Sequence, residues 1–271
     1  MIKVLIKGAG DLATGVAIAL NNSGFKVLMT DIEQPTVIRR SVSFATAIYN
    51  KTVSVEGVEA QLVDSNNYEQ IISNGKVGVI IDPEATIIKS YKPDVVVDAI
   101  LAKKNIGTTI NDAPIVIALG PGFEAAKDCH LAIETKRGHY LGKLIYQGST
   151  IANTGIPGEI GGRKEERVIK APVDGRITWI RKLGDIVAEA EPVLKVDDTI
   201  VRAAFTGCLR GLLMEGLSVH KGMKIGDIDP RRDPNYCTTL SDKSRALGRA
   251  VLEGALKLGK DNGYFGVTKN V

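Results

Sequence analysis

The sequence predicts a three-layer α/β domain at the N-terminus, then a small all-β domain, and finally a C-terminal helix. Three observations predict this order. A glycine-rich loop follows a short apolar run near the start, apolar runs of strand length recur through the first half, and the second half contains an internal repeat. Because the alternation of apolar runs and helical stretches stops near residue 165, we place the domains at residues 1–165, 166–232 and 233–271.

The composition favours a soluble globular protein of the cytoplasm. The 271 residues are 44% apolar and 24% charged, which is ordinary for a folded protein. No run reaches the ~20 apolar residues that span a bilayer, so no membrane segment is expected. The net charge of +4 is small and gives little support to nucleic-acid binding. Three cysteines without Cys-x-x-Cys spacing favour a reducing compartment over a disulfide scaffold.

A glycine loop near the N-terminus has the pattern G-x-G-x-x-G/A. It joins the apolar run Ile2–Ile6 to a helical stretch, with Gly8, Gly10 and Ala13 at its key positions. Gly8 permits a tight turn, Gly10 lets a phosphate approach the backbone, and Ala13 keeps the helix close to the strand. The free N–H groups of a helix start favour an anion, although Asp11 is an unusual neighbour for a pyrophosphate. We therefore predict a Rossmann-like domain that binds a small phosphate-bearing ligand.

Further candidate ligand residues follow the later strands. Asp31 lies just beyond the second strand, roughly 20 residues after the glycine loop, where an acid can bind ribose hydroxyls. Apolar runs at 77–81, 95–99 and 115–119 predict more strands. The loops after the last two carry cationic, amide and glycine residues: Lys103, Lys104, Asn105, Gly120 and Gly122. Because ligands bind beyond the C-terminal ends of parallel strands, we expect all of these on one rim.

A polar segment after these strands contains two of the three histidines. Cys129 is a candidate nucleophile or chalcogen acceptor, with His130 lowering its pKa. The alternative is a buried cysteine beside a structural histidine. Arg137 is a candidate for offsetting the charge of an anionic ligand. His130, Glu134 and His139 have poor spacing for one helix face, so no metal site is predicted.

The second half repeats itself. From Arg167 onward, short β-like segments alternate with turn residues, and two copies match without a gap at an offset of 32 residues. Gly175 matches Gly207, and Asp197 matches Asp229. An ungapped repeat of strand–turn units implies two similar halves that close around one core.

This repeat resembles the biotinyl/lipoyl barrel-sandwich hybrid. In that family, the modified lysine lies at the hairpin that joins the two halves. Here the corresponding stretch is Val196–Ile200, which has no lysine at its tip. We therefore predict a structural or docking module without a carrier lysine. The glycine-rich stretch Asn153–Gly162 is the expected linker before it, and a helix capped by Ser241 is expected to pack on the first domain or on a second subunit.

Short motifs spread over nearly the whole chain are specific in combination: Lys7–Gly15, Arg39–Phe44, Val55–Val58, Asp98–Asn105, Ala118–Phe123, Glu134–His139, Asn153–Gly155 and Ile228–Arg231. Together they resemble the YqeB family, accessory proteins of the selenium-dependent molybdenum hydroxylase system. The resemblance implies a role in maturing such a hydroxylase, with the apo-hydroxylase as partner. The Rossmann-like half is also similar to xanthine dehydrogenase accessory factors, which implies a pocket for a pterin or nucleotide phosphate.

Three functions of different class follow from these features. The first is an accessory protein that binds the molybdenum cofactor, or a nucleotide-like ligand, and assists its insertion or selenium modification. There, Lys103, Lys104 and Arg137 would offset the charge of the ligand, and Cys129 would handle the chalcogen. The second is an NAD(P)-dependent oxidoreductase with Asp31 on a ribose. The third is a non-catalytic scaffold that docks the hydroxylase. The sequence leaves open whether the cofactor is the molybdenum cofactor or a dinucleotide, whether the chain is an enzyme, and whether it forms a homo-oligomer.

Overall fold

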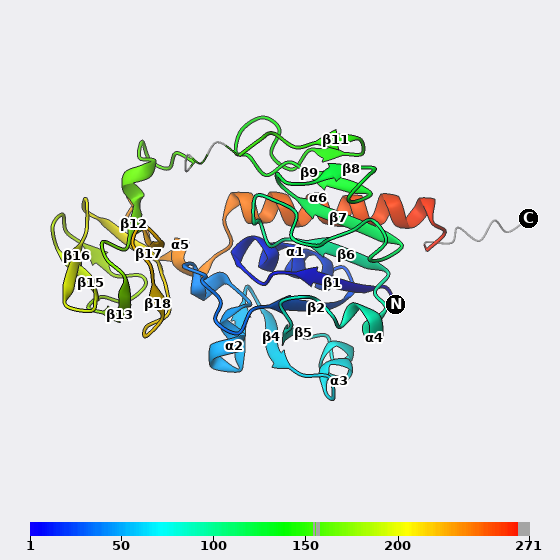
Figure 1. Ribbon diagram of the computed structural model, residues 1–271, viewed down its shortest axis with the longest axis horizontal. Helices are drawn as coiled ribbons and strands as arrows, with labels where there is room; N and C mark the ends of the chain where they lie inside the picture. Colours follow the sequence, from blue (N-terminus) through cyan, green and yellow to red (C-terminus); the bar gives the residue numbers. More distant parts are fainter. Residues whose placement is uncertain (154, 156–157, 265–271) are drawn as a thin grey trace, which may run out of the picture.

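The computed structural model describes residues 1–153, 155 and 158–264 (Figure 1). A large sheet with its helices forms one body, a small β domain lies beside it, and the helix α6 returns across the large sheet. Thr154, Ile156 and Pro157 of the expected glycine-rich linker lie outside the described residues. None of the described helices has the length and apolar character that crossing a membrane requires.

The large sheet has nine strands in the order β10-β9-β7-β6-β1-β2-β5-β4-β3. Its inner strands run parallel, whereas β3 and β10 are antiparallel to their neighbours and close the two edges. Two more short strands, β8 (Glu124–Ala125) and β11 (Gly148–Ser149), pair separately. The nine strands are β1 (Lys3–Lys7), β2 (Lys26–Asp31), β3 (Thr52–Val55), β4 (Val58–Val63), β5 (Val77–Ile81), β6 (Val95–Asp98), β7 (Ile115–Leu119), β9 (Leu131–Ile133) and β10 (Leu144–Ile145).

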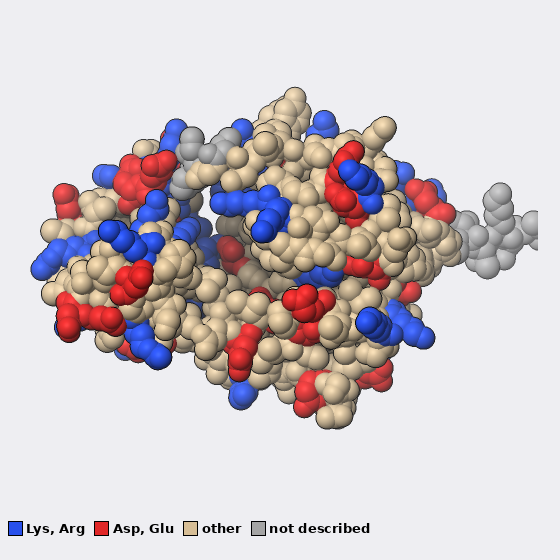
Figure 2. Space-filling model, in the orientation of Figure 1, with Lys and Arg blue, Asp and Glu red and all other residues tan. Residues whose placement is uncertain are grey.

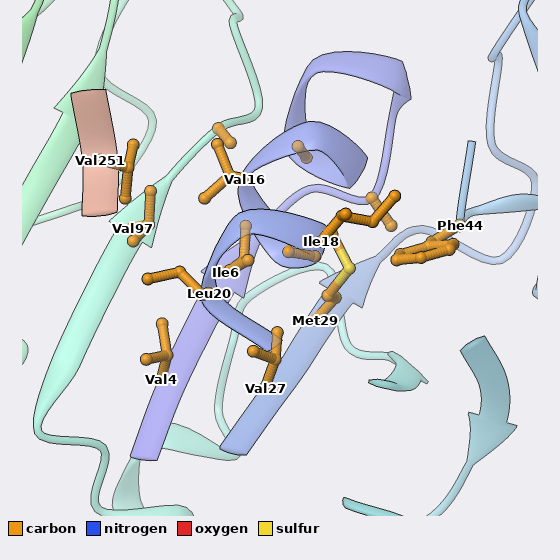
Figure 3. Close-up of a cluster of buried hydrophobic side chains, with 14 of the residues drawn as sticks. Val4, Ile6, Val16, Ile18, Leu20, Val27, Met29, Phe44, Val97 and Val251 are labelled. Atoms are coloured by element: carbon orange, nitrogen blue, oxygen red, sulfur yellow. The ribbon is translucent and has the colours of Figure 1, made fainter. Parts of the chain in front are cut away.

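The inner strands are apolar on both faces because both faces are covered. All residues of β7 are buried, for example. In Figure 3, Val16 and Leu20 of α1 lie over Val4 and Ile6 of β1. That face is covered by α1 (Asp11–Asn21), the 3-10 turn η1 (Arg40–Val42) and α2 (Thr46–Asn50), and the opposite face by α3 (Tyr68–Ser73) and α4 (Ile88–Tyr91).

The C-terminal helix α6 (Asp242–Asp261) belongs to the core of the large sheet. Ser241 caps its N-terminus by accepting a hydrogen bond from the Ser244 amide at 3.1 Å. The apolar stripe of α6 packs on the same face as α1, and Val251 lies beside Val97 of β6 (Figure 3). The sheet of the first domain is therefore covered in part by the last helix of the chain.

Two glycines bring the backbones of α1 and α6 into direct contact. A Cβ atom on Gly248 would overlap the carbonyl oxygen of Gly15, and a Cβ atom on Gly15 would overlap Ser244. The Ser244 hydroxyl donates a hydrogen bond to the Asp11 carbonyl oxygen at 2.7 Å. Only residues without a side chain allow two helices to approach this closely at their crossing point.

The small β domain consists of two four-stranded sheets, in the orders β12-β19-β17-β14 and β16-β15-β13-β18. Strands β12 to β15 come from the first copy of the repeat, and β16 to β19 come from the second. Each sheet takes strands from both copies, since β14 pairs with β17 and β13 pairs with β18. The elements are η2 (Glu165–Arg167), β12 (Val168–Lys170), β13 (Gly175–Trp179), β14 (Ile186–Val187), β15 (Pro192–Val196), β16 (Thr199–Arg202), β17 (Gly207–Leu212), β18 (Ser218–Val219) and β19 (Lys224–Asp229).

A segment of the first domain holds the β domain in place. The Leu212 amide of β17 donates to the Ile38 carbonyl oxygen at 2.7 Å, and the Arg40 Nε donates to the Leu212 carbonyl oxygen at 2.7 Å. The Arg40 guanidinium also lies 4.3 Å from the centre of the Trp179 ring. From the β domain, the short helix α5 (Asn235–Thr238) leads into α6.

The fold class predicted from the sequence, a Rossmann-like three-layer domain followed by a biotinyl/lipoyl-like barrel-sandwich hybrid, is corrected by this topology. The chain is a mixed α/β protein with several separate sheets. The connections from β6 to β7 and from β7 to β9, all of whose residues are described, contain no helix. The β3–β4 hairpin extends the sheet beyond a doubly wound core. The alternation of strands and helices in the sequence could not show that α6 covers the face of β6, β7 and β9 that these helix-free connections leave open.

We expect Gly248→Ala to lower the free energy of unfolding by about 1–3 kcal/mol, because the added methyl group forces α6 away from α1. At an uncrowded helix position, the same substitution raises stability by about 1 kcal/mol. A loss of stability on Gly248→Ala therefore indicates close contact between the two helices. Urea unfolding measures the change in the free energy of unfolding, provided that the m-value stays the same. A variant at least as stable as the native chain would show that the two helices are not in direct contact.

Candidate functional site

Asp31, predicted to bind a ribose, instead closes the glycine loop. Its carboxylate accepts hydrogen bonds from the amides of Ala9 and Ile32, each at 2.8 Å. Gly8 turns the chain with a φ of 88°, and its amide donates to the Thr30 carbonyl oxygen at 2.8 Å. Burial raises the pKa of Asp31 above its ordinary value. The loop thus binds its own chain, and two of its amides are already used.

Three other predicted ligand residues also have roles inside the fold. Ala13 is fully buried in the core under α1. The Gly10 carbonyl oxygen accepts a hydrogen bond from the Thr14 amide at 2.8 Å, which is the first helical bond of α1. The side chain of Asn105 accepts from the Thr108 amide at 2.9 Å and shapes its own loop. Ala13 and Asn105 are therefore engaged within the fold, and the role of Gly10 in phosphate approach stays a prediction.

The loops after β6 and β7 pack against each other. A Cβ atom on Gly122 would overlap the backbone of Lys104, and one on Gly120 would crowd Thr135. These two glycines are therefore needed for close approach between chain segments. Lys103 and Lys104 are exposed and do not line the cavity described below. Gly120 and Gly122 do not line that cavity either, so this part of the predicted rim lies outside its walls.

Cys129 is a core residue, which corrects the predicted catalytic pair. It is fully buried on the sheet face covered by α3 and α4. Burial, and next the charge of Asp128, raise the pKa of its thiol to about 12, so it stays protonated at neutral pH. His130 does not activate it. The Nδ1 atom of His130 accepts a hydrogen bond from the Val116 amide at 3.0 Å, and burial lowers its pKa.

No group of three or more His, Cys, Asp or Glu side chains within residues 1–153, 155 and 158–264 is arranged to hold a metal ion. Glu134, one of the residues considered for such a site, is buried. Its carboxylate accepts hydrogen bonds from the amides of Lys136 and Ile151, each at 2.7 Å. Glu134 therefore ties together the two loops that follow β9 and β11.

A cavity lies between the large sheet and the small β domain, where Lys and Arg side chains gather around a hollow (Figure 2). It has two adjoining compartments of about 270 and 400 Å³, which share Arg39, Arg137 and Arg210. We call it the arginine cavity. The first residues of α1 and the first residues of α6 both lie in its wall, including Asp11 and Ser241. The positive ends of two helix dipoles therefore point toward one place.

Three arginines of this cavity are buried, each less than a tenth exposed: Arg39, Arg167 and Arg210. Arg39 donates to the carbonyl oxygens of Tyr236 and Thr239 at 2.8 and 3.0 Å. Arg167 donates to Asp227 at 2.7 Å. In the described part of the chain, the Nε atoms of all three arginines have no hydrogen-bond partner. Buried donors without partners are rare in folded proteins and are costly.

Asp229 is fully buried behind the wall of the cavity, between Arg210 and Arg231, which line it. It accepts hydrogen bonds from Arg210 at 2.8 Å and from Arg231 at 2.9 and 2.6 Å. Burial acts to raise the pKa of Asp229, but the hydrogen bonds from Arg231 and Arg210 outweigh it and hold the pKa well below its ordinary value. The carboxylate is thereby fixed as an anion that positions Arg210.

Positive charge is concentrated in this cavity. The smaller compartment is lined by two carboxylates, of Asp11 and Asp227, and by six cations: Arg39, Arg137, Arg167, Arg210, Lys224 and Lys243. Two further carboxylates, of Asp229 and Asp242, pair with Arg210 and Arg137 of this wall. The crowding affects the cations themselves. Partial burial, and next Arg137, lower the pKa of Lys243, and burial and then Arg210 lower that of Arg39.

Of the site residues predicted from the sequence, only Asp11 and Arg137 line the arginine cavity. The guanidinium of Arg137 pairs with Asp242 at the start of α6. The buried arginines come from three distant parts of the chain, so no local motif contains them. One signal was present: Arg210 interrupts the apolar strand between Cys208 and Leu213, and a buried charge in such a run needs a partner.

The chain is similar in sequence to a curated protein. It is 48% identical over 256 residues to the uncharacterized protein YqeB of Escherichia coli K12, a match that covers 94% of this chain and 47% of YqeB. The chain is a homologue of YqeB. The resemblance predicted from the sequence motifs is confirmed to that extent, and the chain spans about half the length of YqeB. No family model matches the chain.

Solved structures with some similarity include three from other bacteria. They are a succinylglutamate desuccinylase from Silicibacter sp. TM1040 (13% identical, 84% of each chain covered), an aspartoacylase family protein from Mesorhizobium loti (9%, 84% of each) and the ectoine utilization protein EutE from Ruegeria pomeroyi (9%, 83% of this chain and 85% of EutE). The TM-score is 0.25 for each. Similarity at this level assigns neither a fold nor an activity to the YqeB homologue.

These comparisons correct the predicted function. YqeB is described as uncharacterized, and neither it nor a family model supports a role in molybdenum hydroxylase maturation. The accessory role in maturation is therefore set aside, together with the oxidoreductase and the hydroxylase scaffold. The arginine cavity remains as the feature of the YqeB homologue that a function must explain.

We expect Asp229→Asn to lower the free energy of unfolding by about 3–5 kcal/mol, because it leaves Arg210 buried beside a neutral amide. The effect depends on pH with a definite sign. The folded pKa of Asp229 lies below the unfolded value of about 3.9. Its stabilisation is therefore complete above that pH and is lost as the pH falls toward the folded pKa.

Chemical unfolding at several pH values between about 6 and 2 measures this loss. The native chain should lose more stability below about pH 4 than the Asp229→Asn variant does. Parallel curves for the two proteins would contradict the ion pairs of Asp229.

Proposed function

We propose that this chain binds a small, multiply charged anion, such as one that carries phosphate groups, in the arginine cavity. The observation that carries the proposal is the set of three buried arginines whose Nε donors have no partner within the described chain. A structural ion-pair network would match each buried guanidinium with a carboxylate, as Asp227 and Asp229 match Arg167 and Arg210. Here, Arg39 instead binds two backbone carbonyls and has only a long 3.4 Å contact with Asp11.

The energetics favour an anion over an empty cavity. Removing charged groups from water costs several kcal/mol for each ion unless they are paired. With Asp229 and Asp242, which pair with Arg210 and Arg137, six cations still face only four carboxylates, and the pKa values of Arg39 and Lys243 are lowered. An anion with two or more charges would relieve both the repulsion and the missing hydrogen bonds.

The geometry fits an anion of phosphate type. Planar guanidinium groups present paired N–H donors that match the oxygens of phosphates and carboxylates. The starts of α1 and α6 add backbone N–H groups and helix dipoles on the same side. The compartments of about 270 and 400 Å³ admit a small molecule and exclude a polymer from the buried arginines.

The test compares two lysines of one helix. Lys243 lies in the cavity wall at the start of α6, whereas Lys260 lies at its other end. We expect Lys243→Ala to weaken binding of inorganic pyrophosphate by about tenfold, because one charge-assisted contact is lost. Lys260→Ala should bind as the native chain does. Isothermal titration calorimetry at low salt measures the affinity of each variant for pyrophosphate. Inorganic phosphate, which has a single phosphate group, serves as the comparison ligand.

Rising salt should weaken the native binding, since the attraction is electrostatic and is screened. No detectable heat with pyrophosphate, or an equal loss in the Lys243→Ala and Lys260→Ala variants, would contradict an anion site in this cavity.

A further inference from the structure

Two of the three cysteines of the chain meet beside the arginine cavity. Cys208 lies on β17 of the β domain and Cys237 lies in α5, and their sulfur atoms are 3.6 Å apart. Both are buried, at 0% and 3% exposure. A disulfide has an S–S distance of about 2.05 Å, so the sulfurs need to approach by roughly 1.5 Å. A side-chain rotation with a small backbone shift provides that movement.

The two thiols are not equivalent. The hydrogen bond between the two sulfur atoms, in which either can be the donor, lowers the pKa of Cys237 and raises that of Cys208. The positive charges of Arg210 and Arg39 lower the pKa of Cys237 further. A thiolate is the reactive form of cysteine, and nearby cations favour it. Cys237 is therefore the attacking sulfur and Cys208 is the resolving one.

Cys237 is the only buried residue in α5, a helix of four residues between Pro234 and Thr239. Arg39 and Ser41 hold this segment by donating hydrogen bonds to the carbonyl oxygens of Tyr236, Cys237 and Thr239. Local opening of these bonds exposes the Cys237 thiol. A small neutral oxidant can reach Cys237 in this way. Cys129, by contrast, lies under the sheet with no second sulfur beside it.

We propose that Cys208 and Cys237 form a reversible intramolecular disulfide, and that the oxidant is a small hydroperoxide. The Cys237 thiolate attacks one peroxide oxygen, the O–O bond breaks, and the sulfur becomes a sulfenic acid. The departing oxygen takes up a proton and leaves as an alcohol or as water. The Cys208 sulfur then attacks the Cys237 sulfur, the S–O bond breaks, and the hydroxide takes the Cys208 proton and leaves as water. Two thiols lose two electrons and the peroxide gains them.

The bond connects two elements of the cavity wall. β17 carries Arg210, and α5 is followed by Thr239 and Ser241, which line the larger compartment. Closing a loop of this length restricts the unfolded chain, so the oxidised protein resists unfolding better than the reduced protein. The inference rests on the two sulfurs alone and does not need the anion site.

The experiment treats the reduced chain of 271 residues with hydrogen peroxide, then unfolds it with denaturant in the presence of N-ethylmaleimide and measures its intact mass. We expect one alkylated cysteine, Cys129, where the untreated protein has three. Peptide mapping should find Cys208 linked to Cys237, and dithiothreitol should restore three alkylations. The melting temperature of the oxidised protein should exceed that of the reduced protein.

Matched variants separate the pair from the third cysteine. Cys129→Ala should still form the linked peptide, whereas Cys208→Ala and Cys237→Ala should each form no intramolecular link. A peroxide-treated native chain that keeps three alkylatable cysteines would overturn the proposal. So would a link that includes Cys129, or a pair that forms only after the chain is unfolded.

Discussion

The contact between α1 and α6 is the constraint on which the rest of the architecture depends. Gly15 and Gly248 let the two helix backbones touch, and the Ser244 hydroxyl bridges them through the Asp11 carbonyl oxygen. This contact brings the last helix of the chain back over a sheet whose strands come first. The β domain precedes α6 in the chain, so it is held at two places, by Ile38 and its neighbours and by the segment that enters α6. The starts of both helices then define one side of the cavity.

The charges of the cavity follow from this arrangement. Arginines from the first domain and from the β domain, such as Arg39 and Arg210, are buried where the two bodies meet, and water is excluded from their Nε atoms. Asp229 is itself fully neutralised by Arg210 and Arg231 and cannot compensate the others. In a low-dielectric interface, uncompensated charge costs far more than at a surface. An anion bound at the domain interface would therefore gain strong electrostatic stabilisation from these arginines.

The sequence identified several strands by their apolar runs, and the 32-residue repeat is visible in the way β13 and β14 pair with strands of the other copy. It did not identify the fold class, because sheet order, edge hairpins and the return of α6 are long-range features without a local pattern. The site was missed for the same reason. The glycine motif placed Gly8 and Gly10 at a real turn, but Asp31 satisfies the Ala9 amide. Only the charge of Arg210 within an apolar strand indicated a buried ion.

The two copies of the repeat show how a symmetrical domain acquires one site. Their core positions carry the same kind of residue, as Val187 and Val219 do. The equivalent aspartates differ in their surroundings: Asp197 is exposed and accepts from a backbone amide at 2.8 Å, whereas Asp229 is buried between arginines. At the position of Arg210, the first copy has the exposed Thr178. The repeat therefore accounts for the core of the β domain. The cavity depends on Arg210, which only the second copy carries, and on arginines outside the repeat such as Arg39 and Arg167, so symmetry alone would not have produced it.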